Sequence, residues 1–264
     1  MAVDSKVYFE NAEKQRLVGL LRDTGSSEVA VLCHGFADTK DACFLPGLAA
    51  ALAAEGQSSL RFDFSGNGES EGEFVYAGYW REVEDLRAAV EWLQQQGRTT
   101  TGISGHSKAG SVVIMYAAKY GDVPQVANIS GRFTLNEGIT ARFGQATMER
   151  VKTEGRVRQK VPETGVEFWL TQESVDERIA IGDMHRFCKA VPKTVSVLDI
   201  HGEIDKTINM MDAIRYADAT PGAKLHVVPG GNHTFSDLGA RRELLSYVVP
   251  FLCGKELPSK DSPA

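Results

Sequence analysis

The stretch from Thr100 to Gly110 constrains the fold of this chain more than any other. It reads TTGISGHSKAG and continues into SVVIMYAAKY, which predicts a buried strand, a sharp turn centred on Ser107 and then a helix. Such a turn closes only if the residues two before and two after the serine are small, and Gly105 and Ala109 meet this condition. The pattern predicts a nucleophile elbow, in which a strained serine lies above the free N–H groups of a helix N-terminus. Taken alone, the same residues are also compatible with an ordinary loop, and Ala109 stands where glycine is commoner.

Strand and helix patterns alternate along most of the chain. The first two expected strands, 6–11 and 16–22, form an antiparallel pair, and the run 28–34 is apolar on both faces, as in the middle of a parallel sheet. This alternation predicts an α/β fold with a mostly parallel, doubly wound sheet. The further strands are expected at 58–64, 101–103, 125–130, 194–201 and 223–228, and helices at 41–56, 79–96, 209–219 and 237–252.

The segment 131–192 interrupts this alternation, because it separates two strands where a single helix would suffice. We expect two short helices around Gly144, a short apolar stretch at 166–170, and a helix from a capping box at Ser174–Glu177 to about Ala190. We interpret the segment as a helical cap over the carboxyl edge of the sheet, although it is also compatible with a peripheral decoration. The expected division is therefore a core of residues 1–130 and 193–264 and a cap of residues 131–192, with a polar tail at 256–264 that frays.

A serine hydroxyl becomes a good nucleophile only when a base removes its proton and a third group orients that base. Such groups gather at the carboxyl ends of parallel strands. Asp205 follows the strand 194–201, and His233 follows the strand 223–228, so the order Ser107, Asp205, His233 predicts a catalytic triad.

Glu203 is the nearest rival acid, and Asp199 would lie within the strand. Asp205 is also compatible with a turn or a helix N-cap, and His233 with a packed loop histidine. The other histidines are expected to have structural roles: His34, His106, His185, His201 and His226.

An oxyanion formed at this serine needs two backbone N–H groups nearby. One is expected from Lys108, the residue after the serine, and the other from Phe36 in the loop after the strand 28–34. The backbone acts here, so the identities of these side chains are secondary. We expect the Lys108 ammonium to pair with a carboxylate or to be solvated rather than to take part directly in catalysis.

Composition argues against several classes of partner without excluding them. The net charge of −6 over 264 residues argues against nucleic acid and anionic membranes as main partners, and no apolar run is long enough for stable membrane insertion. The four cysteines show no CxxC spacing and are interpreted as reduced thiols rather than disulfides or metal ligands. The first residues carry no secretory signal, so a cytoplasmic location is expected, unless an organelle transit peptide precedes this sequence. The sequence does not indicate an oligomeric state.

Five motifs together resemble the α/β-hydrolase superfamily. They are His34-Gly35-Phe36, Asp63-Phe64-Ser65-Gly66-Asn67-Gly68-Glu69-Ser70, Gly105-His106-Ser107-Lys108-Ala109-Gly110, His201-Gly202-Glu203-Ile204-Asp205 and Gly231-Asn232-His233. Within that superfamily the chain resembles serine esterases of the feruloyl/cinnamoyl esterase and monoacylglycerol lipase type. Lys108 and Ser130-Gly131-Arg132 are similar to a group of uncharacterised plant α/β-hydrolases. The resemblance implies an α/β-hydrolase fold and hydrolysis of a small-molecule ester through an acyl-enzyme, with no metal or organic cofactor.

The first functional hypothesis is therefore a serine hydrolase that acts on carboxylic esters. A protein that keeps the fold but binds a ligand or signals with little turnover is the alternative from another class, because fold does not fix function. An acyltransferase or a thioesterase would share the acyl-enzyme and differ in the acceptor or the leaving group.

The cap is rich in basic residues, which indicates either a solvated helix face or a surface that steers an anionic substrate. The residues in question are Arg142, Arg150, Lys152, Arg156, Arg158 and Lys160.

Overall fold

An eight-stranded sheet forms the centre of the protein, in the order β1-β2-β4-β3-β5-β6-β9-β10. The computed structural model describes residues 3–258, so the last six residues of the expected core and tail lie outside the described part. β1 pairs antiparallel with β2 and β2 with β4, whereas the other neighbours are parallel. The expectation of a mostly parallel α/β sheet is confirmed. The strands are β1 (Asp4–Glu10), β2 (Arg16–Arg22), β3 (Glu28–Cys33), β4 (Ser58–Phe62), β5 (Thr99–His106), β6 (Gln125–Ile129), β9 (Ser196–Gly202) and β10 (Lys224–Val228).

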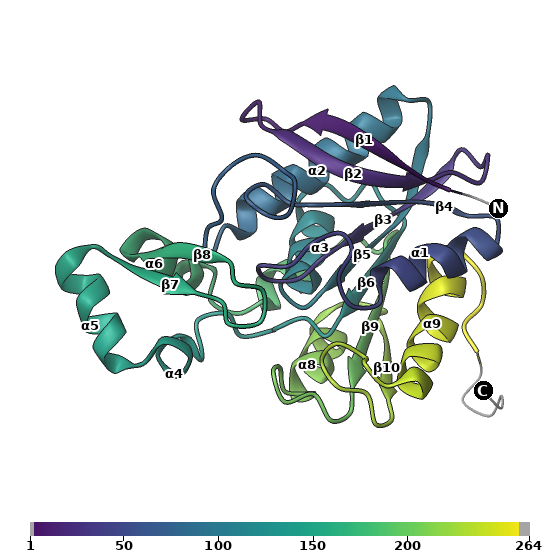
Figure 1. Ribbon diagram of the computed structural model, residues 1–264. Helices are drawn as coiled ribbons and strands as arrows, with labels where there is room; N and C mark the ends of the chain where they lie inside the picture. Colours follow the sequence, from purple (N-terminus) through teal and green to yellow (C-terminus); the bar gives the residue numbers. More distant parts are fainter. Residues whose placement is uncertain (1–2, 259–264) are drawn as a thin grey trace.

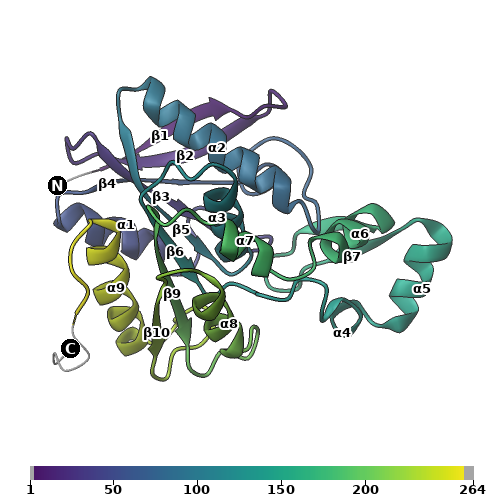
Figure 2. The same ribbon diagram turned by 180° about the vertical axis from the view of Figure 1, so that it is seen from behind.

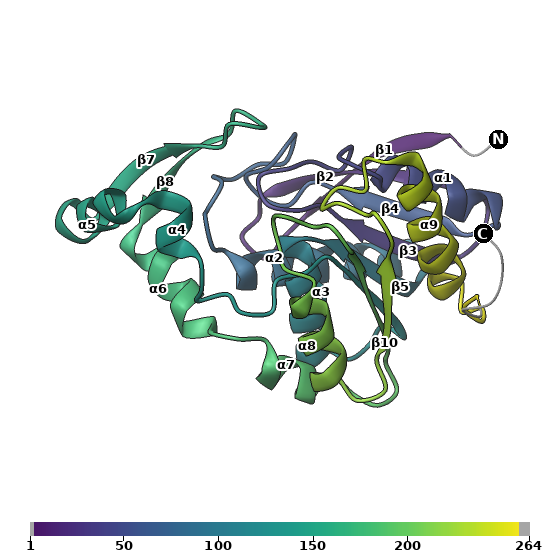
Figure 3. The ribbon, with the colours of Figure 1, turned by 90° about the horizontal axis from the view of Figure 1, so that it is seen from below.

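Helices cover both faces of this sheet (Figures 1 and 2). One face carries α1 (Leu45–Ala54) and α9 (Leu238–Leu252), and the other carries α2 (Tyr79–Gln95), α3 (Lys108–Lys119) and α8 (Met211–Ala219). Figure 3 shows the two layers from below, with the sheet between them. No helix within residues 3–258 has both the length and the apolar character needed to cross a bilayer.

The central strands are apolar on both sides because both sides are covered. In β3, Val31 and Cys33 pack into one apolar cluster, whereas Ala30 and Leu32 pack into the cluster on the opposite face. Successive side chains of a strand point to opposite faces, so one short run of apolar residues contributes to both cores. This packing fixes the strand ends on which the site residues lie.

The segment 131–192, which we call the cap, projects largely to one side of the core (Figure 1). Part of it packs around a separate apolar cluster that includes Met148, Val151 and Leu170. The expected break between two short helices at Gly144 is present. The elements of the cap are α4 (Ile139–Phe143), α5 (Gln145–Glu154), β7 (Arg156–Lys160), β8 (Glu167–Thr171), α6 (Gln172–Ile181) and α7 (His185–Ala190).

Two details of the cap differ from expectation. First, the apolar stretch at 166–170 belongs to an antiparallel hairpin of β7 and β8, which was not expected because β7 is mostly charged. Second, the capping box consists of Thr171 and Ser174, so the predicted box at Ser174–Glu177 is wrong. The helix then ends at Gly182, where φ is +71°, and does not run on to Ala190. The separate helix α7 packs against α3 in the core cluster. The boundaries of the cap at 131 and 192 stay a prediction.

Candidate active site

Ser107 lies at a tight turn between β5 and α3. Its φ of +56° and ψ of −115° are unusual for a residue with a side chain, and such strain persists only where the surroundings impose it. Here the Ser107 N–H donates to the carbonyl of Ile129 in the neighbouring strand at 2.8 Å. A Cβ at Gly105 would lie 2.1 Å from the carbonyl oxygen of Ala109, so only glycine fits there. The strand, turn and helix expected from the sequence are all present.

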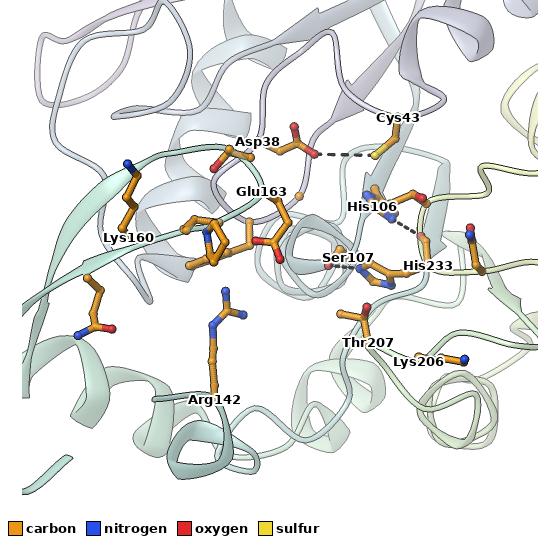
Figure 4. A pocket seen from close by; sticks show the side chains of 18 of the residues that line it. Asp38, Cys43, His106, Ser107, Arg142, Lys160, Glu163, Lys206, Thr207 and His233 are labelled. Carbon is orange, nitrogen blue, oxygen red and sulfur yellow. Dashed lines mark hydrogen bonds between the residues drawn. The ribbon is translucent and has the colours of Figure 1, made fainter. Parts of the chain in front are cut away.

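The structure brings Ser107, His233 and Asp205 together, although the loops that carry them are far apart in the sequence. His233 Nε2 lies 2.9 Å from the Ser107 hydroxyl oxygen (Figure 4). His233 Nδ1 lies 2.7 Å from a carboxylate oxygen of Asp205. Because a carboxylate accepts a hydrogen bond, Nδ1 carries the hydrogen and Nε2 is left to accept the proton of the serine.

Several hydrogen-bond donors keep the Asp205 carboxyl group ionised. Its side chain is fully buried, and one oxygen accepts the N–H groups of Thr207 and Ile208 at 2.7 and 2.9 Å. Burial alone raises the pKa of this carboxyl, but hydrogen bonds from His201 and His233 outweigh burial and hold the pKa well below its usual range. An ionised Asp205 can orient His233 and stabilise its protonated form.

The two rival acids make other contacts. Asp199 lies inside β9, where it accepts a hydrogen bond from Asn128 at 2.8 Å, and burial raises its pKa to about 8. Glu203 is exposed and accepts the N–H of Gly230 at 3.0 Å. Of the three acids on this strand and loop, Asp205 is therefore the one positioned to orient His233.

Two contacts hold the loop of His233 in place. His106, the residue before the serine, bonds through Nε2 to the backbone carbonyl of His233 at 2.8 Å. Burial lowers the pKa of His106 to about 3, so its ring is neutral and the hydrogen lies on Nε2. In addition, a Cβ at Gly202 would lie 2.3 Å from the carbonyl oxygen of Gly231, so the loops that carry the acid and the base touch through backbone atoms.

Phe36 and Lys108, the two expected oxyanion donors, both lie beside Ser107. They line one small pocket together with the serine. A Cβ at Gly35 would lie 3.2 Å from Ser107 Cβ, so the backbone that leads into Phe36 passes close to the nucleophile. The Phe36 ring meets Phe74 and Tyr76 edge to face at 5.1 and 5.9 Å. This packing fixes the loop whose N–H is expected to face the oxyanion.

The Lys108 side chain is buried under the elbow and makes a salt bridge. Its ammonium lies 2.7 Å from a carboxylate oxygen of Glu82 in α2, and both side chains are less than a tenth exposed. Burial lowers the pKa of Lys108 and raises that of Glu82, and each partner counteracts the effect on the other. The expectation that Lys108 pairs with a carboxylate is confirmed, and the pair ties the elbow to α2.

Sequence reasoning assigns His201 a structural role, but the structure places it against Asp205. Its Nε2 lies 3.0 Å from the carbonyl of Ile208 and 3.3 Å from Asp205. His201 and Asp205 are four residues apart, and this spacing is the signal that could have linked them.

A cavity of about 940 Å³ opens on Ser107 and His233 between the core and the cap (Figure 4). Its walls mix apolar and charged side chains, among them Phe143, Phe168, Lys160 and Glu163. A cavity of this size can hold a small organic molecule. Within residues 3–258, no group of three or more His, Cys, Asp or Glu side chains is placed to hold a metal ion.

Comparison with known proteins places the chain in a family. The family model described as Hydrolase_4, serine aminopeptidase S33, matches residues 25–178, which is more than half of the chain. The chain belongs to this family of α/β-hydrolases. A curated relative is the uncharacterized 31.7 kDa protein in the traX-finO intergenic region of Escherichia coli. It is 25% identical over 206 residues, which cover 74% of this chain and 67% of the relative.

Solved structures share the fold of this α/β-hydrolase at low sequence identity. Est1E from Butyrivibrio proteoclasticus, solved with ferulic acid bound, has a TM-score of 0.75 at 18% identity and covers 94% of this chain and 98% of its own. The Pyrococcus furiosus esterase Pf2001 has a TM-score of 0.73 at 19% identity, with coverages of 96% and 92%. The α/β-hydrolase GrgF from Penicillium sp. sh18 has a TM-score of 0.77 at 18% identity, with coverages of 95% and 98%. These likenesses confirm the α/β-hydrolase fold.

Proposed function

We propose that this protein is a serine hydrolase that cleaves carboxylic esters through an acyl-enzyme. The observation that carries the proposal is the hydrogen-bonded chain from Ser107 through His233 to Asp205, at 2.9 and 2.7 Å. The esterases among the structures of the same fold agree with it.

In the proposed first step, His233 Nε2 takes the proton of Ser107, and the serine oxygen attacks the ester carbonyl carbon. The carbonyl oxygen becomes an oxyanion, which the N–H groups of Phe36 and Lys108 stabilise. The tetrahedral intermediate then collapses, the C–O bond to the alcohol breaks, and protonated His233 gives its proton to the leaving alcohol. Water, deprotonated by His233, attacks the acyl-enzyme in the same way and releases the acid together with free Ser107.

The test is fluorophosphonate labelling together with hydrolysis of a series of 4-nitrophenyl esters. We expect the wild type to be labelled and to hydrolyse the esters, and Ser107→Ala to do neither. Asp205→Asn should lower kcat by about 10⁴-fold, because it removes the acceptor that orients His233. Glu203→Gln is the matched control, since Glu203 lies nearby on the same loop, and it should stay within about twofold of the wild type.

The pH dependence tests the role of His233. A general base acts in its unprotonated form, so kcat/KM should rise with pH if a histidine supplies the base. A flat profile from about pH 5 to 8 would contradict this role.

Other outcomes separate the remaining functions. A well-folded wild type that is neither labelled nor active would favour a ligand-binding or signalling protein. Faster reaction with a thioester, or transfer to an added alcohol in preference to water, would indicate a thioesterase or an acyltransferase. Preference for an aminoacyl 4-nitroanilide over the esters would indicate the aminopeptidase activity for which the family is named.

A further inference from the structure

A second, smaller pocket opens beside Ser107. Its volume is about 230 Å³, and it shares Ser107, Phe36, Arg142 and Thr207 with the large cavity. His233 lines the large cavity and is not among the residues that line the small one. The lining of the small pocket includes three arginines and two tyrosines, of which only Arg142 also lines the large cavity: Arg132, Arg142, Arg178, Tyr76 and Tyr79.

Arg178 is the most rigidly held of the three arginines. It comes from α6 of the cap, and its side chain is buried between the cap and the core. Its Nε donates to the carbonyl of Leu135, and its Nη1 donates to the hydroxyl of Tyr76. The guanidinium carbon lies 5.2 Å from the centre of the Tyr76 ring. A guanidinium fixed in this way loses little further freedom when it binds an anion.

Arg132 and Arg142 complete the basic wall of the pocket. Arg132 follows β6 and donates from Nη2 to the carbonyl of Thr207 at 2.9 Å. Arg142 lies in α4, and its guanidinium carbon lies 4.3 Å from the centre of the Phe36 ring. Figure 4 shows that the Arg142 side chain points into the space between the cap and Ser107. Three arginines from three different segments therefore converge beside the serine.

Within residues 3–258 none of these three arginines forms a salt bridge, although the carboxylates of Glu163 and Asp212 act at longer range on Arg142 and Arg132. By contrast, Arg150 and Arg158 elsewhere in the cap are each paired with a glutamate. Lys108 is already paired with Glu82. One acid, Glu137, lines the same pocket, so positive charge exceeds negative charge there.

The pKa of Arg142 is consistent with an excess of positive charge in the small pocket. Although part of Arg142 is exposed, burial of its guanidinium lowers its pKa. The positive charges of Arg178 and Arg132 act in the same direction, against the opposing effects of Tyr76 and Glu163. An anion in the pocket would relieve this repulsion. The guanidinium group has the geometry to bind both oxygens of a carboxylate at once.

The positions of the two cavities assign them to the two halves of an ester. His233 must give its proton to the leaving alcohol, so the alcohol lies in the large cavity that His233 lines. The small pocket is lined by Lys108, one of the proposed oxyanion donors, and His233 is not among its lining residues. The acyl chain therefore extends into the small pocket.

We propose that this pocket binds a carboxylate at the far end of a short acyl chain, so that the preferred substrates are monoesters of short dicarboxylic acids. This inference rests on the proposed esterase function. It assigns Arg132, Arg142 and Arg178 as the residues that select the acyl group.

Two esters of the same shape and different charge test the inference. They are the mono-4-nitrophenyl ester of glutaric acid and 4-nitrophenyl 5-methylhexanoate, in which an isopropyl group replaces the carboxylate. After subtraction of the spontaneous rate, kcat/KM of the wild type should be about tenfold or more higher for the anionic ester, as charge-assisted hydrogen bonds would give.

The ratio of the two kcat/KM values is then compared between variants. Arg142→Gln should lower this ratio by about tenfold, and Arg132→Gln should lower it in the same direction. Arg150→Gln is the matched control, because Arg150 lies in the next helix of the cap and lines neither cavity, and it should keep the wild-type ratio. Arg178 is left unchanged, since its loss would also break the contacts with Leu135 and Tyr76. If a substitution alters the reactivity of Ser107 itself, it alters kcat/KM for both esters alike. Such an effect therefore cancels in the ratio.

The outcomes separate the inference from the function on which it rests. If the wild type hydrolyses the neutral ester as well as the anionic one, or if Arg142→Gln keeps the ratio, the acyl pocket does not select carboxylates and the esterase proposal stands. If neither ester is hydrolysed and the fluorophosphonate does not label Ser107, both proposals fall together.

Discussion

The elbow of the core and the outer surface of the cap hold their charged side chains in opposite ways. Under the elbow, Lys108 and Glu82 form a buried pair, and Asp199 is buried within β9. On the outer surface of the cap, Arg150 pairs with Glu154 four residues along an exposed helix, and both side chains are about half exposed.

The difference in burial indicates how the stability of each part responds when a charged side chain loses its partner. A buried charge that loses its partner is left in a medium of low polarity, whereas an exposed pair is replaced by water at little cost. We therefore expect charges in the core to govern stability, and changes in the cap to affect mainly the choice of substrate.

The largest effect is expected from Lys108→Met. This change leaves the Glu82 carboxylate buried without its partner and should lower the free energy of unfolding by about 3 to 5 kcal/mol, measured by urea unfolding. Adding Glu82→Leu should recover most of the loss, because no isolated charge remains. A loss below about 1 kcal/mol for the single variant would show that the core tolerates charges as the cap surface does.

Asp199→Asn should change the free energy of unfolding by less than Lys108→Met does, and it should raise this free energy rather than lower it. The carboxyl titrates near 3.8 when unfolded, and burial raises its pKa in the folded protein to about 8. The folded state therefore keeps a proton that the unfolded state releases, and this group makes the wild type less stable as pH rises from about 4 to 8. Asparagine does not titrate and still offers an oxygen to Asn128.

The variant should thus be more stable than the wild type by about 2 to 4 kcal/mol at pH 8 and equal to it near pH 4. The measurement is urea unfolding of both proteins at the two pH values. A difference that does not change with pH would mean that Asp199 is ionised in the folded core.

The smallest effect on the free energy of unfolding is expected at a contact between the cap and the core. Glu177 of α6 accepts the N–H groups of Gly78 and Tyr79 at 3.0 and 3.1 Å, and so caps the first turn of α2. Glu177→Gln should lower the free energy of unfolding by about 1 kcal/mol, because the negative charge at the helix N-terminus is lost. Thermal unfolding measures this loss, and limited proteolysis shows whether the cap opens.

Asp176→Asn is the control for Glu177, since it changes the neighbouring exposed acid of the same helix. It should have an effect of less than about 0.5 kcal/mol. Equal effects of the two changes would mean that the cap is not tied to the core through α2.

Most of the core could be predicted from the sequence because its signals are local. An apolar run such as Val29–Cys33 can be buried only between two layers of helices, and Gly105 with Ser107 permits one kind of turn. The cap was predicted less well because its hairpin depends on pairing. Arg156–Lys160 carries mostly charged residues and becomes a strand because Glu167–Thr171 pairs with it.

The features of the candidate site also divide into those that local sequence signals indicate and those that depend on contacts between distant segments. Ser107, Asp205 and His233 could be named because each follows the end of a strand, and their order along the chain fits a triad; their roles stay proposals. The sequence could not show that Glu82 lies under Lys108 or that Arg178 lines a pocket together with Ser107. Those contacts join segments far apart in the chain, and they exist only when the core and the cap pack together.

The contact between Gly202 and Gly231 has a consequence for any relative of this chain. Asp205 and His233 are held at hydrogen-bonding distance by two backbone segments that touch with no room for a methyl group. A protein could therefore keep the serine, the aspartate and the histidine at matching positions and still be inert, because one alanine at Gly202 would push the two loops apart. The presence of the three side chains in an aligned sequence is then a sign of activity only together with the glycine at position 202.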